Sequence, residues 1–365
     1  MRVAVLGANG FFGTRAVELW LAEGIEVRPV VRSFASLARL SRWDLDCRVA
    51  DARDEPSLRK AFEGCDVVVH AVAGNADVVE GTAAPALRAA HAAGVRRMVY
   101  LSSASVHGQD PPSGTTEDAP LSDRQWHWYN NAKVRAERAL AAARRAGSCE
   151  TVVIRPGVVW GPRSRWVTDP FEAARAGRLA VVDGGRGVVN SVFADNLAAA
   201  VALAWETPGV DGRVYFVQDG ENLTWRDFYE PILAAAGRSW ADVADVPFPE
   251  PKPPGFGDRV EALRGSKTMQ KILPRVPSRL KRAGRAVLKA IPEPPKPEPF
   301  ALPRPPAPSV SEEMARLYRC RWRLSDERAR RELGYRPVRT FDEGMAITLE
   351  WMRRAGYPVA AEDGG

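Results

Sequence analysis

A tyrosine and a lysine four residues apart, Tyr129 and Lys133, are the side chains of this sequence best suited to acid–base chemistry. They stand in a stretch that predicts a helix reaching Arg145, so both project from one helix face. An ammonium beside a phenol stabilises the phenolate, and we expect it to lower the pKa of Tyr129 from ~10 toward neutral pH. Such a phenol could donate a proton to an alkoxide or remove one from an alcohol.

A serine run supplies a hydroxyl for the same site. Residues 97–101 predict a strand, and residues 102–105 directly after it read Ser-Ser-Ala-Ser. Ligands bind at the carboxyl ends of parallel strands, where a serine hydroxyl could hold and polarise a carbonyl oxygen while hydride moves to or from a nicotinamide. The Tyr-x-x-x-Lys spacing alone is a weak signal. It gains specificity from this serine run and from a glycine-rich turn at the start of the chain.

That turn is the element we expect to bind a dinucleotide. Residues 3–6 predict a strand, and the glycines follow it in the stretch Gly7-Ala8-Asn9-Gly10-Phe11-Phe12-Gly13. Gly7 permits a tight turn, Gly10 lets a pyrophosphate approach the backbone, and Gly13 lets helix and strand pack closely. The next helix would present its free N–H groups and positive dipole end to the phosphates.

Arg32 bears on the choice of cofactor. It follows the strand expected at 25–31, where an acid would bind the ribose of NAD and an arginine can pair with the 2′-phosphate of NADP. Arg32 therefore favours NADP, with NAD and an exposed arginine without a ligand as the alternatives. Asp51 follows the strand expected at 47–50 and would lie by the adenine. The strand expected at 67–71 leads into small residues that leave room under a cofactor, Ala71, Val72 and Ala73.

Strands that alternate with helices predict an α/β fold, a Rossmann-type doubly wound parallel sheet with a smaller C-terminal substrate lobe. We expect residues 1–162 and 188–220 to form the dinucleotide-binding domain, and 163–187 with 221–365 to form the lobe. Asp195 is expected to cap one helix, and Thr224 with Asp227 to approach a capping box at another.

These motifs together resemble the extended short-chain dehydrogenase/reductases, the group of epimerases, dehydratases and 3β-hydroxysteroid dehydrogenases. The resemblance covers about residues 1–220 and resumes at 322–337. It rests on Gly7-x-x-Gly10-x-x-Gly13, Asp51, His70-Ala71, the serines before Val106-His107-Gly108, Tyr129-x-x-x-Lys133, Arg155-Pro156-Gly157, Gly161-Pro162-Arg163 and residues 192–197. It implies that Ser103, Tyr129 and Lys133 are catalytic, and that the backbone of Pro156 and Gly157 meets the nicotinamide.

The resemblance and the turn together give one set of expected cofactor contacts. In chain order they are Gly7, Asn9, Gly10, Phe11, Phe12, Gly13, Arg32, Asp51, Ala71, Val72, Ala73, Lys133, Pro156 and Gly157.

Three positions depart from the family pattern. Val78 stands where many members carry an asparagine before Gly81-Thr82, so a proton relay through that asparagine is not expected. His107 stands where the family usually has a tyrosine, and we interpret it as a buried, hydrogen-bonded histidine, with a substrate contact as the alternative. Val189 falls about where sugar-nucleotide enzymes place an arginine for the substrate diphosphate. That counts against a sugar nucleotide, although Arg163, Arg165 or Arg186 could substitute.

The composition indicates which kinds of partner and which cellular compartment we expect. The four cysteines lie far apart, so neither a disulfide framework nor a metal site is expected. We find no signal peptide or membrane-length apolar run, which favours the cytoplasm.

Sixteen of the 29 prolines fall in 247–308, and residues 264–289 carry nine Lys/Arg and no acid. The basic amphipathic helix expected at 264–291 could be solvated, cover an apolar substrate or rest on anionic lipid. Without interleaved aromatic residues it does not predict nucleic-acid binding.

The sequence therefore predicts an NAD(P)-dependent oxidoreductase that interconverts a secondary alcohol and a ketone, with a small-molecule substrate of lipid-like or polycyclic type. The alternatives are a sugar-nucleotide epimerase, dehydratase or reductase with tightly bound NAD, and a non-enzymatic NADP-binding sensor. A sensor has no need of a tuned phenol. A homodimer is left open.

Overall fold

A computed structural model of the chain describes residues 1–144, 149–249 and 307–360. Except for residues 248, 249 and 307, these belong to one compact unit, which joins Met1–Pro247 with Pro308–Gly365. The basic helix expected at 264–291 lies outside the described residues. Within the described part, no helix is both long enough and apolar enough to cross a membrane.

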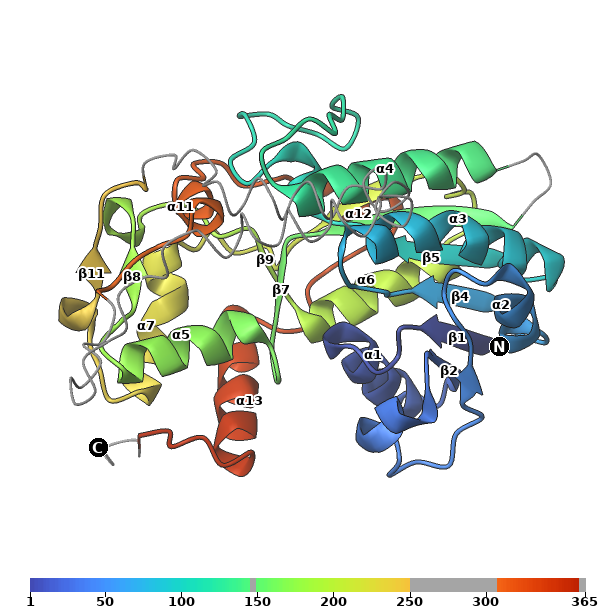
Figure 1. Ribbon diagram of the computed structural model, residues 1–365, viewed down its shortest axis with the longest axis horizontal. Coiled ribbons are helices and arrows are strands. Elements are labelled where there is room, and N and C mark those ends of the chain that lie inside the picture. Colours follow the sequence, from blue (N-terminus) through green and yellow to red (C-terminus); the bar gives the residue numbers. More distant parts are fainter. Residues whose placement is uncertain (145–148, 250–306, 361–365) are drawn as a thin grey trace, which may run out of the picture. The chain divides into compact units, whose positions relative to one another are not determined.

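A seven-stranded parallel sheet forms the centre of this unit, in the order β10-β6-β5-β4-β1-β2-β3 (Figure 1). This order confirms the predicted doubly wound α/β fold, because the chain runs outward from β1 to β3 and then returns to build the other half. The strands are β1 (Arg2–Leu6), β2 (Glu26–Val31), β3 (Arg48–Val49), β4 (Val67–His70), β5 (Arg97–Leu101), β6 (Glu150–Pro156) and β10 (Val214–Val217).

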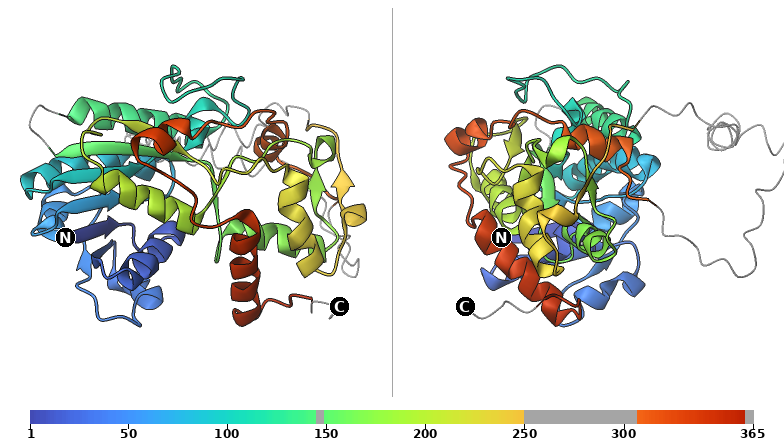
Figure 2. Two further views of the ribbon diagram at one scale, coloured as in Figure 1. Left: turned by 180° about the vertical axis from the view of Figure 1, so that it is seen from behind. Right: turned by 90° about the vertical axis from the view of Figure 1, so that its left-hand side faces the viewer.

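Helices cover both faces of the sheet (Figures 1 and 2). The helices α1 (Phe11–Ala22) and α6 (Ala194–Glu206) lie on one face, and α2 (Glu55–Phe62), α3 (Ala76–Ala92) and α4 (Trp128–Ala143) lie on the other. Because successive strand residues point to opposite faces, Val3 and Val5 of β1 belong to the core with α1 and α6, whereas Ala4 and Leu6 belong to the core with α2, α3 and α4.

Several of the remaining elements contribute to an aromatic cluster around Trp160, whereas α12 (Glu327–Glu332) packs on β10. Trp160 has Phe193, Phe228 and Phe341 around it, with ring centroids 4.9, 5.5 and 5.3 Å away. The remaining elements are β7 (Val158–Trp160) paired with β9 (Ser191–Phe193), β8 (Ala180–Val181) paired with β11 (Ala244–Asp245), α5 (Arg165–Arg175), α7 (Trp225–Ala235), α11 (Glu312–Tyr318), α12 (Glu327–Glu332) and α13 (Phe341–Arg354). Short 3₁₀ helices complete the described chain, η1 (Phe34–Arg39), η2 (Ala104–His107), η3 (Asp183–Gly185) and η4 (Trp240–Asp242).

Of the two helix caps that we expected, one is present and the other is not. Thr224 and Asp227 form the capping box at the start of α7. The expectation for Asp195 is wrong, because the cap residue of α6 is Phe193 and Asp195 lies inside the first turn. Its carboxylate instead accepts hydrogen bonds from Nε and Nη2 of Arg15 on α1, both at 2.7 Å. A carboxylate in the first turn is also favoured by the helix dipole, so the ion pair joins α1 to α6 at no cost to the helix.

Candidate active site

A cavity of about 600 Å³ opens at the carboxyl ends of the central strands. All the residues expected to contact the cofactor line it except Gly13 and Gly157. The lining members of that set are Gly7, Asn9, Gly10, Phe11, Phe12, Arg32, Asp51, Ala71, Val72, Ala73, Lys133 and Pro156.

The glycines explain how the turn comes so close to the sheet. Gly7 has φ +91°, and a Cβ there would lie 2.8 Å from the carbonyl oxygen of Ala71 at the end of β4. Gly13 does not line the cavity because it lies under the turn, where a Cβ would be 2.3 Å from the carbonyl oxygen of Gly7. Gly10 faces the cavity, and α1 begins after it without a side-chain cap. The first N–H groups of α1 are therefore suited to bind an anion.

Two arginines lie at the far end of this cavity, beside Asp51. Arg32 was expected there, and Arg53 was missed. Arg53 donates to Oδ1 of Asp51 from its backbone N at 2.9 Å, and this bond is the main cause that lowers the pKa of Asp51. The proximity of Arg53 to Asp51 in the sequence was the signal that could have revealed it.

The three residues expected to be catalytic lie together. The helix α4 begins at Trp128, and its first turns carry Tyr129 and Lys133 beside the end of β5. Nζ of Lys133 donates to the carbonyl oxygen of Leu101 at 2.7 Å and lies 5.9 Å from the centroid of the Tyr129 ring. Ser103 lies close enough to Tyr129 to lower the pKa of its phenol, and Oγ of Ser103 is 2.8 Å from Oγ of Ser105.

The pKa of Tyr129 differs from the expectation in direction. Burial raises it to about 12, a hydrogen bond with Ser103 lowers it, and the charge of Glu313 raises it. Lys133 is not among the groups that shift the pKa of Tyr129, and its ammonium donates to the carbonyl oxygen of Leu101. Burial also lowers the pKa of Lys133 to about 8. At neutral pH the phenol therefore keeps its proton, and Lys133 is mostly an ammonium.

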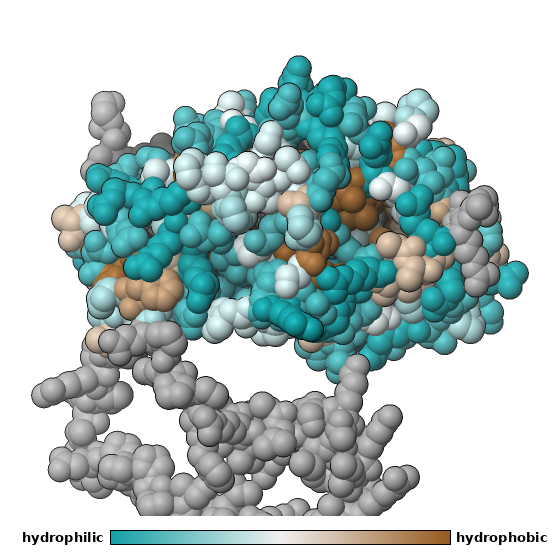
Figure 3. Space-filling model, turned by 90° about the horizontal axis from the view of Figure 1, so that it is seen from above, coloured by the Kyte–Doolittle hydropathy of each residue, from teal (hydrophilic) through white to brown (hydrophobic). Residues whose placement is uncertain are grey.

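A second cavity of about 460 Å³ meets the first one at Tyr129. Both are lined by Tyr129, Ser102, Phe11 and Ala73, and the second adds Ser103 and Gly157. Much of its remaining lining is apolar, including Val158, Trp166, Trp225, Leu317 and Leu324. In the view from above, hydrophilic residues cover much of the surface, and strongly hydrophobic ones are seen near the middle of this face and in smaller patches toward its edges (Figure 3).

A buried ion pair supports the floor of the site, and the sequence analysis missed it. Glu137, one turn beyond Lys133, accepts hydrogen bonds from Oγ of Ser102 and from Nε and Nη2 of Arg155 at 3.0 and 2.7 Å. The spacing of Tyr129, Lys133 and Glu137 puts all three on one face of α4, which was the available signal.

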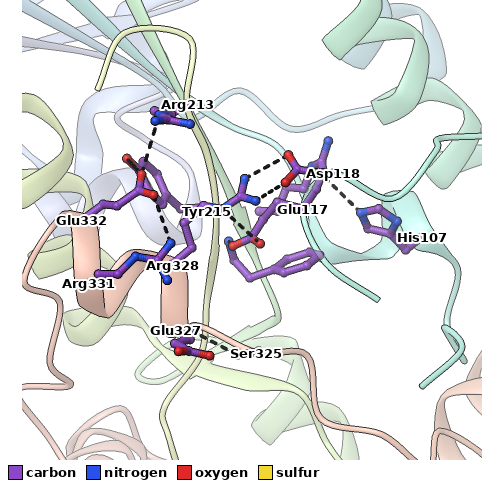
Figure 4. A network of polar contacts seen from close by, with 12 residues as sticks. His107, Glu117, Asp118, Arg213, Tyr215, Ser325, Glu327, Arg328, Arg331 and Glu332 are labelled. Carbon is purple, nitrogen blue, oxygen red and sulfur yellow. Dashed lines mark hydrogen bonds and ion pairs between the residues drawn. The ribbon is translucent and has the colours of Figure 1, made fainter. Parts of the chain in front are cut away.

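Arg155 extends this pair to the loop before α4. It donates to the carbonyl oxygen of Glu117 at 2.8 Å and lies 3.0 Å from Nε2 of His107. The carboxylates of Glu117 and Asp118 in turn face Arg328 of α12, and Glu332 of the same helix accepts from Tyr215 of β10 (Figure 4). The expectation of a hydrogen-bonded His107 is confirmed, but the residue is only partly buried. Burial and the charge of Arg155 lower its pKa to about 4, which keeps it neutral.

Within the described residues, no three His, Cys, Asp or Glu side chains are grouped so that they could hold a metal ion.

Comparisons with known proteins agree with this geometry. The model of the NAD dependent epimerase/dehydratase family matches residues 3–217. A 4-hydroxy-2-methyl-3-oxo-4-farnesyl-3,4-dihydroquinoline-1-oxide ketoreductase from Stigmatella aurantiaca is 28% identical over 98% of this chain and 97% of its own length. A 3-beta-hydroxysteroid dehydrogenase from Mycolicibacterium neoaurum is 31% identical over 66% of this chain and 72% of its own length.

Solved structures share the fold. A dTDP-glucose 4,6-dehydratase from Streptomyces venezuelae, solved with NAD bound, superposes with a TM-score of 0.67 at 22% identity, over 97% of this chain and 97% of its own. Since the family match spans more than half of the chain, the resemblance inferred from the motifs is confirmed. The chain belongs to the NAD dependent epimerase/dehydratase family and is an oxidoreductase-type enzyme with a nicotinamide cofactor.

Proposed function

We propose that this enzyme reduces a ketone to a secondary alcohol with NADPH, and that Tyr129, Lys133 and Ser103 carry the acid–base chemistry. The observation that supports this most is the meeting of the two cavities at Tyr129, with Ser103 and Lys133 beside it. When bound, the reduced cofactor supplies the hydride. The chain then acts on the carbonyl oxygen of the substrate: Ser103 donates a hydrogen bond to it and Tyr129 transfers its proton to it. The Lys133 ammonium places a positive charge 5.9 Å from the centroid of the ring that becomes the phenolate.

Tyr129 starts in the protonation state that ketone reduction needs. Its pKa is raised to about 12, so the phenol is protonated at neutral pH and carries the proton that the carbonyl oxygen takes up.

The residues of the first cavity fit a dinucleotide with a 2′-phosphate. Gly7 and Gly10 would let the backbone approach the pyrophosphate, and the start of α1 would bind it. Arg32 and Arg53 at the Asp51 end offer two guanidinium groups for the 2′-phosphate. Both arginines support NADP over NAD.

The second cavity fits an apolar ketone. Its Trp and Leu side chains would bury a lipid-like or polycyclic skeleton, and Val189 is buried where a diphosphate-binding arginine would be needed. Relatives named as acting on a farnesylated quinoline oxide and on 3β-hydroxysteroids support the same substrate class.

We also propose the division into a dinucleotide-binding domain and a substrate lobe, and the linings of the two cavities support it. The first cavity is lined only from within 1–162 and 188–220, which we assign to cofactor binding. The second cavity adds residues 163–166, Trp225, Glu313 and Leu317, which we assign to the substrate lobe.

Replacement of Tyr129 by phenylalanine tests the proposal. The variant keeps the ring and its packing but loses the proton donor, so kcat for NADPH-dependent ketone reduction should fall by ~10²–10⁴-fold. NADPH affinity, measured by fluorescence titration, should stay within twofold. Tyr357→Phe, where the ring packs on Phe171, is the matched control and should keep full activity. Near-normal turnover of folded Tyr129→Phe would refute the assignment, and tightly bound NAD⁺ in the purified protein would support an epimerase instead.

A further inference from the structure

A carboxylate lies in the otherwise apolar second cavity. The helix α11 starts with its N-cap Ser311 accepting from the backbone of Met314, and it brings Glu313 and Leu317, one turn apart, into the cavity lining. The Glu313 side chain stays 38% accessible. A residue on the same helix, Glu312, pairs instead with Arg316 at 2.7 Å and is absent from the lining of that cavity.

His127, at the start of α4, holds the Glu313 carboxylate close to Tyr129. Nε2 of His127 lies 3.1 Å from Oε2 of Glu313, and the His127 ring packs between Trp126 and Trp128 at centroid distances of 5.8 and 5.7 Å. His127 is the N-cap residue of α4 and precedes Tyr129 by two positions. Glu313 is near enough for its charge to raise the pKa of Tyr129.

The cations of the same cavity already have carboxylate partners. Arg163 pairs with Glu18 at 3.0 Å, and Arg165 pairs with Asp169 at 2.8 Å. The partner of Glu313 is different, because a histidine carries a compensating charge only when it is protonated. Among the described residues, the ion-pair partner of Glu313 is His127, and the Glu313 side chain lines the cavity.

We propose that Glu313 makes the second cavity selective for neutral ketones, by repelling substrates that carry a carboxylate near the reacting carbonyl. This inference rests on the proposed ketone reduction and specifies its substrate class. A fixed like charge in a partly desolvated pocket disfavours an anion by Coulomb repulsion, and the anion also loses hydration on entry. A neutral ester or hydroxylated ketone incurs neither penalty, and a hydroxyl can donate to the second carboxylate oxygen.

A matched pair of ketones tests this selectivity. The full-length enzyme with NADPH is assayed on 3-oxododecanoate and on methyl 3-oxododecanoate, which differ in the charge at one end. We expect kcat/KM to favour the ester by about tenfold or more. Glu313→Gln should bring the ratio close to one, because the acid gains relative to the ester, whatever change in turnover the two ketones share. Glu312→Gln is the control and should keep the unmodified ratio.

Binding without turnover separates this inference from the proposed reaction. Dodecanoate or methyl dodecanoate is titrated into the NADP⁺-loaded protein, and binding is followed by tryptophan fluorescence. The unmodified protein should bind the ester more tightly, and Glu313→Gln should remove the difference. Equal preference for acid and ester in both assays, or a preference unchanged in Glu313→Gln, would overturn the role of Glu313. A charge-dependent binding preference in a protein that reduces neither ketone would support the role of Glu313 and refute the proposed reaction.

Discussion

Replacement of Glu137 by glutamine removes a buried charge from beneath the candidate active site while keeping the shape of the side chain. Its carboxylate accepts from Ser102 and twice from Arg155, and the two side chains of the ion pair are only 9% and 4% exposed. Loss of one partner leaves the Arg155 guanidinium with neutral partners only, His107 and the carbonyl oxygen of Glu117. Breaking a buried pair in this way costs ~3–5 kcal/mol. The unfolding equilibrium constant should therefore rise by about 10²–10⁴-fold.

Urea unfolding followed by tryptophan fluorescence measures this loss, provided that the m value is unchanged. The control is Glu230→Gln on α7, which breaks the exposed pair with Arg226 and should cost at most ~0.5 kcal/mol. A loss below ~1 kcal/mol for Glu137→Gln would refute the reasoning.

The same variant should shift the pH range of the reaction. Burial lowers the pKa of Lys133 to about 8 even though the charge of Glu137 raises it. Without that charge the pKa of Lys133 falls further, so its ammonium is lost at lower pH. The alkaline decline of kcat should therefore begin at lower pH in Glu137→Gln than in the unmodified enzyme. An alkaline decline at the same pH in both would contradict the role given to Lys133.

Two further predictions concern the cofactor and acid stability. Arg32→Ala should weaken NADPH binding by ~1.5–3 kcal/mol and leave NADH unaffected, as measured by fluorescence titration; equal affinities of the unmodified protein for the two cofactors would contradict it. Burial, with the charge of Lys133, lowers the pKa of His70 to about 3. Because the unfolded chain takes up this proton near pH 6.5, stability should fall by up to ~1.4 kcal/mol per pH unit between pH 6.5 and 3. In His70→Gln the free energy of unfolding, measured with urea, should depend less on pH between pH 6.5 and 3. An unchanged pH dependence in this variant would contradict the role given to His70.

The parts of the molecule that follow local rules were predictable from the sequence. A strand that ends in Gly7 and continues into a helix at Phe11 is set by turn geometry and hydrophobic periodicity, both of which act over a few residues. The spacing of Tyr129 and Lys133 fixes their common helix face in the same way. These local patterns gave the fold, the cofactor cavity and the position of the three candidate catalytic residues.

Features that depend on distant parts of the chain were not predictable. The partner of Glu137 is Arg155 on β6, and the partner of Asp195 is Arg15 on α1. Neither contact leaves a local pattern, since each forms only when the sheet brings the segments together. The burial of a side chain also depends on how distant segments pack together. Burial is the main reason why the pKa of Tyr129 is raised, although Lys133 stands one turn away.

The alternation of β1 side chains between two cores has an evolutionary consequence. The buried sets around α1 with α6 and around α2 with α3 and α4 have no residue in common, since the sheet backbone separates them. A change of side-chain volume on one face is therefore absorbed by helices that do not contact the other face. The two sides of the enzyme can diverge separately, so the side that carries Tyr129 and Lys133 can stay constant while the opposite helices are repacked.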